Sequence, residues 1–103
     1  MSIDFESLDY YDKLILYYLS KTQELPNQRE LSRKTDINYR TVLTKVQKLK
    51  GIGYIQMDSK GQQKLVAIAK KGLEFLEGWK KTAIAGRTIT QYDELLERNK
   101  SNK

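Results

Sequence analysis

Residues 36–55 read DINYRTVLTKVQKLKGIGYI, and this stretch decides the fold. At 3.6 residues per turn, Val42, Val46 and Leu49 lie together on one side of a helix over about residues 39–50. The opposite side carries hydroxyl-bearing and basic side chains, namely Tyr39, Arg40, Thr41, Thr44, Lys45 and Lys48. The pattern predicts a helix that docks on a core with one side and presents polar, cationic groups on the other.

A shorter helix is expected just before this one. Asn27 is a good N-cap, and Glu30 follows at the capping-box spacing, so a helix is predicted over about residues 28–35. The three residues between the two helices allow only a tight turn, in which Ile37 is the buried anchor and Asn38 caps the second helix. Two helices joined this closely cross steeply, as in a helix-turn-helix.

After the second helix the pattern changes from helical to alternating. Gly51 is expected to end the helix in the left-handed conformation that glycine tolerates. Residues 54–58 and 64–68 read as two short strands, and residues 59–63 form a polar, glycine-containing tip between them. Two such strands around such a tip indicate a β-hairpin.

Apolar residues at helical spacing flank this unit on both sides. They predict a first helix over about residues 6–21 and a longer helical stretch after the hairpin, either one kinked helix or two helices broken near residues 85–90. The expected fold class is α+β and mostly helical. Three helices and the hairpin form a domain over residues 1–69, and a C-terminal helix or helix pair forms residues 70–103.

The composition excludes several classes of function. The 103 residues include no His and no Cys, which removes imidazole bases, thiol nucleophiles, disulfides and the common zinc sites. The carboxylates are not grouped as a metal cluster would require, so we expect no enzyme, no cofactor and no metal. No apolar run approaches the roughly 20 residues that cross a bilayer, and no signal peptide is visible. We therefore expect a cytoplasmic protein with no membrane contact.

The net charge of +6 is unevenly distributed along the chain. Residues 21–64 hold ten Lys or Arg against four Asp or Glu, whereas residues 1–20 hold four acidic residues against one Lys. A local basic field attracts polyanions and speeds their association. The excess positive charge thus lies in the segment that contains the opening stretch, and the acidic first helix is expected to face away from a bound polyanion.

The order helix, helix, turn, helix, hairpin, helix resembles a winged helix-turn-helix domain. Residues 25–55, LPNQRELSRKTDINYRTVLTKVQKLKGIGYI, resemble that family's run from its second helix into the first strand of the wing. Residues 67–79, AIAKKGLEFLEGW, resemble the T-x-K-G start of the last helix in small archaeal winged-helix regulators and Sso10a-like DNA-binding proteins. Ala69 stands where that family often has Thr, which leaves the capping of this helix in question.

The resemblance covers about residues 8–80, and it implies a role in binding double-stranded DNA. The helix over residues 39–50 would enter the major groove, while the hairpin over residues 54–68 would touch the flanking backbone or the minor groove. The residue types on the helix fit that role independently, because base edges are read by Arg, Lys, Asn, Gln, Thr and Tyr.

Base contacts are expected mainly from the exposed side of the second helix of the pair. Leu43 lies on the same arc, where it either meets a thymine methyl group or is partly buried against the preceding helix. Gln28, Arg29, Lys34 and Lys48 are better placed for phosphates, and the hairpin tip either follows the backbone or is simply solvated. The full DNA-binding set is Gln28, Arg29, Lys34, Asn38, Tyr39, Arg40, Thr41, Leu43, Thr44, Lys45, Lys48, Lys60, Gln62, Gln63 and Lys64.

The C-terminal stretch carries more apolar residues than a small winged core needs. They are Leu73, Leu76, Trp79, Ile84, Ile89, Tyr92, Leu95 and Leu96. Such a surface predicts a homodimer through about residues 72–98 that reads two half-sites. The alternative is a helix that folds back on its own domain.

These observations favour a DNA-binding transcriptional regulator that acts as a homodimer. One alternative is an architectural protein that coats DNA with little sequence preference, although such a protein needs mainly Lys and Arg rather than a chemically varied set. A second alternative is a winged-helix module for protein interaction, which the basic and polar helix face disfavours. The sequence assigns no small-molecule effector.

Overall fold

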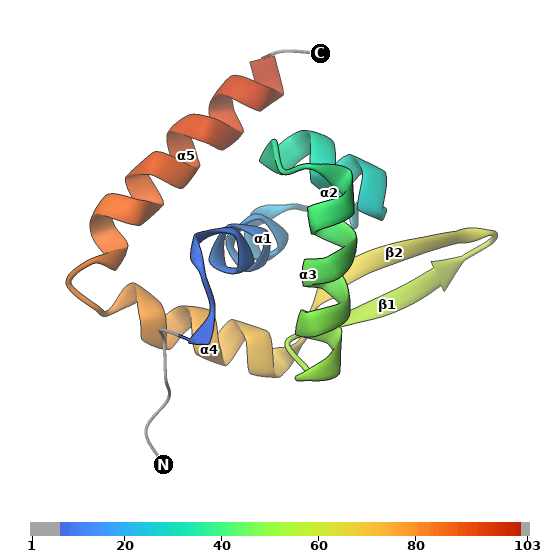
Figure 1. The fold of residues 1–103 in the computed structure, drawn as a ribbon, viewed down its shortest axis with the longest axis horizontal. Helices are drawn as coiled ribbons and strands as arrows, with labels where there is room; N and C mark the ends of the chain where they lie inside the picture. Colours follow the sequence, from blue (N-terminus) through green and yellow to red (C-terminus); the bar gives the residue numbers. More distant parts are fainter. Residues whose placement is uncertain (1–6, 102–103) are drawn as a thin grey trace.

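The computed structural model describes residues 7–101, in which five α-helices accompany one two-stranded antiparallel sheet (Figure 1). In chain order the elements are α1 (Tyr10–Lys21), α2 (Gln28–Thr35), α3 (Tyr39–Gly51), β1 (Ile55–Lys60), β2 (Gln63–Ile68), α4 (Lys70–Lys80) and α5 (Ala85–Ser101). The predicted fold class is confirmed. The C-terminal segment forms two separate helices, and the break between them lies at residues 81–84 rather than at 85–90.

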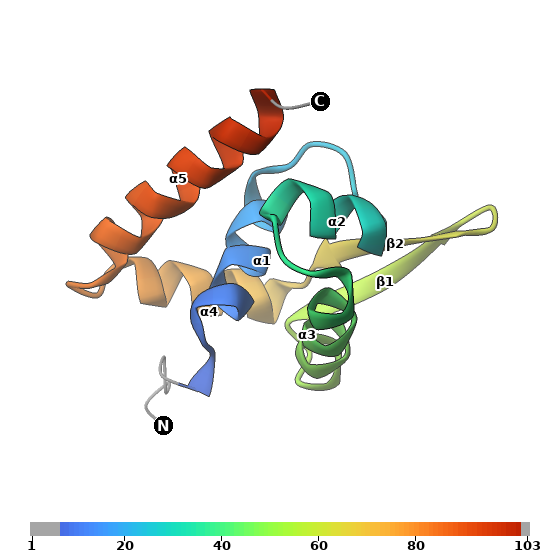
Figure 2. The same cartoon turned by 45° about the horizontal axis from the view of Figure 1, so that its top comes forward.

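Helix α1 lies in the middle of the molecule, with α2, α4 and α5 arranged around it (Figures 1 and 2). Its residues Leu14, Ile15, Leu16, Tyr17 and Leu19 are all buried. Burying a Leu or Ile side chain completely contributes roughly 1.5–3 kcal/mol of transfer free energy. Because the buried positions surround much of the helix, α1 is the element on which the others dock.

The start of α1 differs from the prediction that the helix begins near Glu6. Glu6 lies outside the described residues, and the helix begins at Tyr10 because Asp9 is its N-cap. The Asp12 amide donates to the Asp9 carboxylate at 2.9 Å, and the Asp9 amide donates to the Asp12 carboxylate at 3.0 Å. This reciprocal capping box fixes the first turn.

The helix-turn-helix forms as the capping pattern predicts. The Asn27 side chain accepts from the Glu30 amide at 2.8 Å, and the Glu30 carboxylate accepts from the Asn27 amide, so the predicted capping box before α2 is confirmed. The turn into α3 contains buried Ile37, as predicted, and Asp36 takes up a left-handed conformation with φ of 57°.

The end of α3 corrects one detail of the prediction. Gly51 is still helical, and the left-handed residue is Gly53, with φ of 82°. The Gly53 amide donates to the carbonyl of Lys50 at 3.0 Å, and the Tyr54 amide reaches back to the carbonyl of Leu49 at 2.9 Å. These bonds close the last turn two residues later than expected and direct the chain into β1.

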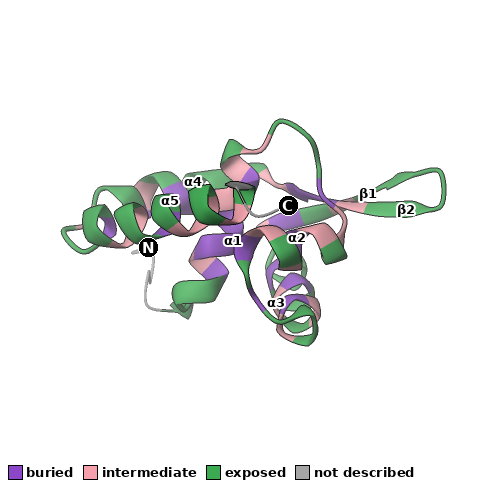
Figure 3. Cartoon of the chain, turned by 90° about the horizontal axis from the view of Figure 1, so that it is seen from above, coloured by how far each residue is buried: buried purple, intermediate pink, exposed green. Residues whose placement is uncertain are grey.

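The hairpin is longer than predicted, with a tip of only two residues. Pairing runs from Ile55 opposite Ile68 to Lys60 opposite Gln63, and Gly61 in the tip has φ of 65°. The base of the hairpin is buried and its outer half is exposed, so it projects from the body of the molecule (Figure 3). The amide of Val66 donates to the carbonyl of Pro26 at 2.8 Å, which attaches β2 to the segment before α2.

Helix α5 turns back across the domain and completes the core. Tyr92 is fully buried, its ring packs on those of Tyr10, Tyr17 and Trp79, and its hydroxyl donates to the carbonyl of Tyr10. Burial raises the pKa of Tyr92, so its hydroxyl stays protonated. Further along α5, the Asn99 amide group donates to the carbonyl of Lys34 on α2 at 2.9 Å.

This arrangement corrects the predicted dimer surface. Leu76, Trp79 and Tyr92 are buried in the core of their own chain, so in this fold they are not available to a second copy. Ile89, Leu95 and Leu96 are partly buried against the same core, whereas Leu73 and Ile84 are exposed. The alternative interpretation, a helix that folds back on its own domain, describes α5.

Gly72 should be intolerant of a side chain. A Cβ atom there would lie 2.2 Å from the carbonyl oxygen of Tyr54, which already accepts from the Ala69 amide. We expect Gly72→Ala to lower the free energy of unfolding by about 1–3 kcal/mol, because the α4 start must move away from the hairpin. Urea denaturation followed by Trp79 fluorescence measures this change.

Gly86→Ala is the matched control, because a Cβ atom at this helical glycine would meet nothing within 4 Å. We expect this variant to raise the free energy of unfolding by about 0.5–1 kcal/mol. Equal stability of the two variants would contradict the proposed close approach at Gly72.

Candidate nucleic-acid interface

The exposed side of α3 carries a row of chemically mixed side chains. Arg40, Thr44 and Gln47 are all exposed, and their spacing of four and three residues places them on the side opposite the buried residues of α3. Arg40 and Thr44 are among the residues predicted from the sequence, whereas Gln47 is not. The same i, i+4, i+7 spacing that identified the core side would have found it.

The first turn of α3 is held by its own N-cap residue and by a contact with α2. The Asn38 side chain accepts from the Arg40 amide at 2.9 Å, which fixes the start of the helix. The guanidinium of Arg29, on α2, lies 4.8 Å from the ring centroid of Tyr39, a cation–π contact between two exposed side chains. Arg29 and Tyr39, for which the sequence predicts DNA contacts, are therefore together at the N-terminal end of α3.

Thr41 and Leu43 flank the exposed row and are both of intermediate exposure. For Leu43 this placement agrees with the alternative interpretation of partial burial. Neither residue lies as far out as Arg40 or Thr44.

The structure corrects the placement of Lys45. Its ammonium group forms an ion pair with Asp9 and lies 3.6 Å from Asp12, and its side chain is only 15% exposed. Lys48 donates to the Asp12 carboxylate at 2.6 Å, with its side chain 41% exposed. The acidic start of α1 therefore lies beside α3 and binds two of its lysines, because the fully buried carboxylate of Asp12 needs cationic partners.

The electrostatics of this contact follow from opposing effects. Burial alone raises the pKa of Asp9, but the hydrogen bonds from Lys45 and from the Asp12 amide, with the lysine charge, outweigh it and lower the pKa below its ordinary value. Burial alone lowers the pKa of Lys45, but its hydrogen bond to Asp9 and the charges of both carboxylates raise it. Both groups are therefore charged at neutral pH.

Beside the exposed row, the hairpin adds a second polar surface. Lys60, Gln62, Gln63 and Lys64 are all exposed, as predicted for a wing that can reach a DNA backbone. A groove of about 280 Å³ runs between α2, α3 and the hairpin. Its lining includes Gln28, Gln47, Lys50, Ser59 and Lys64, so the structure brings both strands of the hairpin close to the outer side of α3.

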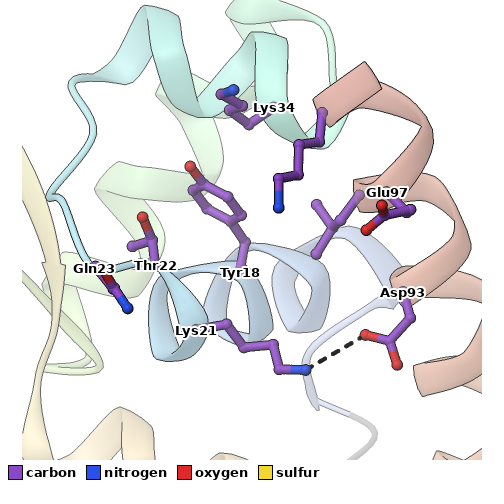
Figure 4. Close-up of a pocket in the computed structure, with 9 residues that line it drawn as sticks. Tyr18, Lys21, Thr22, Gln23, Lys34, Asp93 and Glu97 are labelled. Atoms are coloured by element: carbon purple, nitrogen blue, oxygen red, sulfur yellow. Dashed lines mark ion pairs between the residues drawn. The ribbon is translucent and has the colours of Figure 1, made fainter. Parts of the chain in front are cut away.

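Lys34 does not lie at the groove between α2, α3 and the hairpin. It lines a pocket of about 610 Å³ between α1, α2 and α5, together with Tyr18, Lys21 and Asp93 (Figure 4). The ammonium group of Lys21 and the carboxylate of Asp93 form an ion pair at 3.6 Å across this pocket. The predicted phosphate contact of Lys34 is thus separated from the groove of Gln28 and Lys64, which is on the hairpin side of α2.

Within residues 7–101, no three carboxylates, His or Cys gather as a metal site would require. Over the same range, each helix is too short or too polar to cross a membrane. The candidate site consists of polar and basic side chains on a helix-turn-helix and a hairpin.

Comparison with known families agrees with this architecture. A model described as winged helix-turn-helix DNA-binding matches residues 8–56, which reach from just before α1 into β1. The match and the five helices with their hairpin define the class of the protein, a winged helix-turn-helix fold. The matched family is one of DNA-binding proteins, in agreement with the expectation that the chain is not an enzyme. No curated protein sequence matches the chain.

Several solved structures share this fold. A MarR-family transcriptional regulator from Rhodococcus sp. RHA1 superimposes with a TM-score of 0.68 at 16% identity, over 94% of this chain and 73% of that one. CouR from Rhodococcus jostii RHA1, solved with p-coumaroyl-CoA, gives 0.65 at 17% identity, over 93% and 70%. Staphylococcus aureus MarR, in complex with salicylate and kanamycin, gives 0.61 at 19% identity, over 90% and 71%.

These likenesses concern the fold. The finer resemblance to archaeal regulators and Sso10a-like proteins stays a prediction, because none of the three structures tests it.

The ion pair of Asp9 predicts a pH-dependent contribution to stability. A carboxylate whose pKa falls on folding stabilises the protein above its ordinary pKa, near 3.8, and loses that effect as the pH falls through the folded value. We expect Asp9→Asn to unfold at lower urea concentration than the wild type at pH 7, with a difference that shrinks at pH 3. Asp58→Asn, on the exposed hairpin, should show neither effect.

Proposed function

We propose that this protein is a DNA-binding transcriptional regulator that places α3 in the major groove and the hairpin on the flanking backbone. The observation that carries the proposal is the mixed row of Arg40, Thr44 and Gln47, exposed on the second helix of a helix-turn-helix. The major groove is wide enough for an α-helix, and it distinguishes all four base pairs.

Each member of the row has a defined chemistry toward bases. The Arg40 guanidinium matches the two acceptors of a guanine edge, and the Gln47 amide matches the donor and acceptor of adenine. Thr44 offers a methyl group to thymine, while its hydroxyl already donates to the carbonyl of Arg40 at 3.2 Å. Three side chains of different chemistry can distinguish bases, whereas binding by attraction to phosphates alone would need only positive charge.

Phosphate contacts belong to the residues around this row. Arg29 and Tyr39 lie at the start of α3, and Gln28 lies beside Lys64 in the groove toward the hairpin. The hairpin adds Lys60, Gln62 and Gln63. Contacts of this kind fix the orientation of a protein on DNA without reading its sequence.

For the assembly, we propose a homodimer with a narrower contact than the sequence predicts. Two exposed apolar residues remain from the predicted surface, Leu73 on α4 and Ile84 in the α4–α5 connection. Ile84 is 69% exposed. Two-fold pairing through these residues would leave the core position of Tyr92 unchanged and would double the groove contacts.

Arg40→Ala tests the readout. Selection of bound fragments from a random-sequence duplex pool should yield an enriched motif for the wild type. The variant should lose preference at one position of each site, at a cost of about 1–3 kcal/mol, because one bidentate base contact is missing. Lys81→Ala, which removes the same charge at the far end of α4, should leave the motif unchanged.

Selection also separates the alternatives. Binding that depends strongly on salt but enriches no motif would replace the regulator with a coating protein. Absence of binding even at low salt would reject the DNA hypothesis and leave a protein partner for the basic surface.

Sedimentation tests the homodimer. We expect the wild type to sediment as a dimer at micromolar concentration. Ile84→Lys should sediment as a monomer, because the dimer would have to bury a lysine charge that has no partner. Ile52→Lys, at another exposed isoleucine, is the matched control and should remain a dimer. A monomeric wild type would reject the assembly and leave Leu73 and Ile84 as ordinary surface residues.

A further inference from the structure

The contact between α1 and α3 contains an unusual buried charge. Among residues 7–101, Asp12 is the one ionisable acid or base whose side chain is completely buried, apart from the tyrosines. One carboxylate oxygen accepts from the Asp9 amide at 3.0 Å and from the Lys48 ammonium group at 2.6 Å. The other oxygen has no hydrogen bond and lies 3.6 Å from the ammonium group of Lys45.

A buried carboxylate of this kind determines where its cationic partners lie. Removing a charge from water is strongly unfavourable unless opposite charges and hydrogen bonds surround it. Lys45 and Lys48 supply those charges, and Asp9 adds a direct ion pair to Lys45. The ammonium group of Lys45 is therefore held against α1, and its side chain remains only 15% exposed although it belongs to the recognition helix.

We propose that Asp9 and Asp12 form a charge clamp on the recognition helix that withholds Lys45 from DNA phosphates and so lowers non-specific affinity. The inference rests on the proposed DNA-binding function and assigns specificity-determining roles to two acidic residues of α1. Affinity for any duplex depends mainly on phosphate contacts, whereas Arg40, Thr44 and Gln47 depend on the sequence. Pairing Lys45 with carboxylates removes one contact that does not depend on sequence. A larger share of the binding free energy then comes from the sequence-dependent contacts of that row.

Asp9 is the residue at which the hold on Lys45 can be weakened while the helix cap is kept. Its side chain is 54% exposed, and asparagine caps a helix as well as aspartate does. Asp9→Asn therefore keeps the hydrogen bond to the Asp12 amide and removes the ion pair to Lys45. Asp12 and Lys48 are left in place, so the buried carboxylate keeps its shortest partner.

A double-mutant cycle measures the clamp directly. We would titrate a fluorescent duplex of arbitrary sequence with the wild type, Asp9→Asn, Lys45→Gln and the double variant, between about 50 and 200 mM salt. Asp9→Asn should bind about 3- to 10-fold more tightly at the low-salt end, with a salt slope more negative by about 0.9, because Lys45 gains one phosphate. Lys45→Gln alone should change affinity less than about twofold, since its charge is already engaged.

The double variant distinguishes release of Lys45 from simple loss of a repelling carboxylate. If Lys45 is released, Lys45→Gln should abolish the gain and restore the wild-type salt slope. If the gain persists in the double variant, the clamp is overturned, because general repulsion by Asp9 then explains it. Glu74→Gln, an exposed residue on α4 with the same change of charge, should leave the affinity within about twofold of the wild type.

Two further outcomes would also overturn the inference. In the first, Lys45→Gln alone weakens binding and flattens the salt slope, which would mean that Lys45 contacts phosphate in the native protein. In the second, the wild type binds DNA and Asp9→Asn binds equally well. Either result leaves the proposed function intact, whereas failure of the wild type to bind any duplex removes both.

Discussion

The enclosure of α1 is the constraint on which the rest of the structure depends. Its apolar side chains from Leu14 to Leu19 point in several directions, so no single partner can cover them. The helix-turn-helix covers one side, α4 another, and α5 returns across the remaining one with Tyr92. Because α3 is positioned through this shared centre, the orientation of its exposed row depends on packing that lies far from any base contact.

Two kinds of interaction therefore meet on α3. Apolar burial fixes its inner side, and the carboxylates at the start of α1 fix two lysines along its edge. The remaining exposed residues take part in neither contact, which leaves them available for the recognition role proposed for them. This division explains how a helix of 13 residues supports a core and still presents Arg40, Thr44 and Gln47 to a partner.

Local chemistry made much of the fold predictable. Asn27 with Glu30, Ile37 in the turn and the alternating strands depend on neighbours within a few residues, and the structure agrees with each. Contacts between distant segments were not predictable in the same way. The amphipathic pattern of residues 39–50 predicted that Lys45 points outward. That pattern could not indicate that the start of α1 lies beside Lys45. Tyr92 carried an apolar signal that fits an interface or a core equally well, and only the path of α5 decides between them.

The contact between Tyr92 and Tyr10 joins residues that are 82 positions apart. This separation has a consequence for how the chain folds while it is being synthesised. On the ribosome, the helix-turn-helix and the hairpin emerge while α1 still lacks its last covering helix. The nascent chain thus exposes the aromatic rings of Tyr10, Tyr17 and Trp79 until α5 is translated. The part of the chain that would meet DNA is therefore completed before the helix that closes the core.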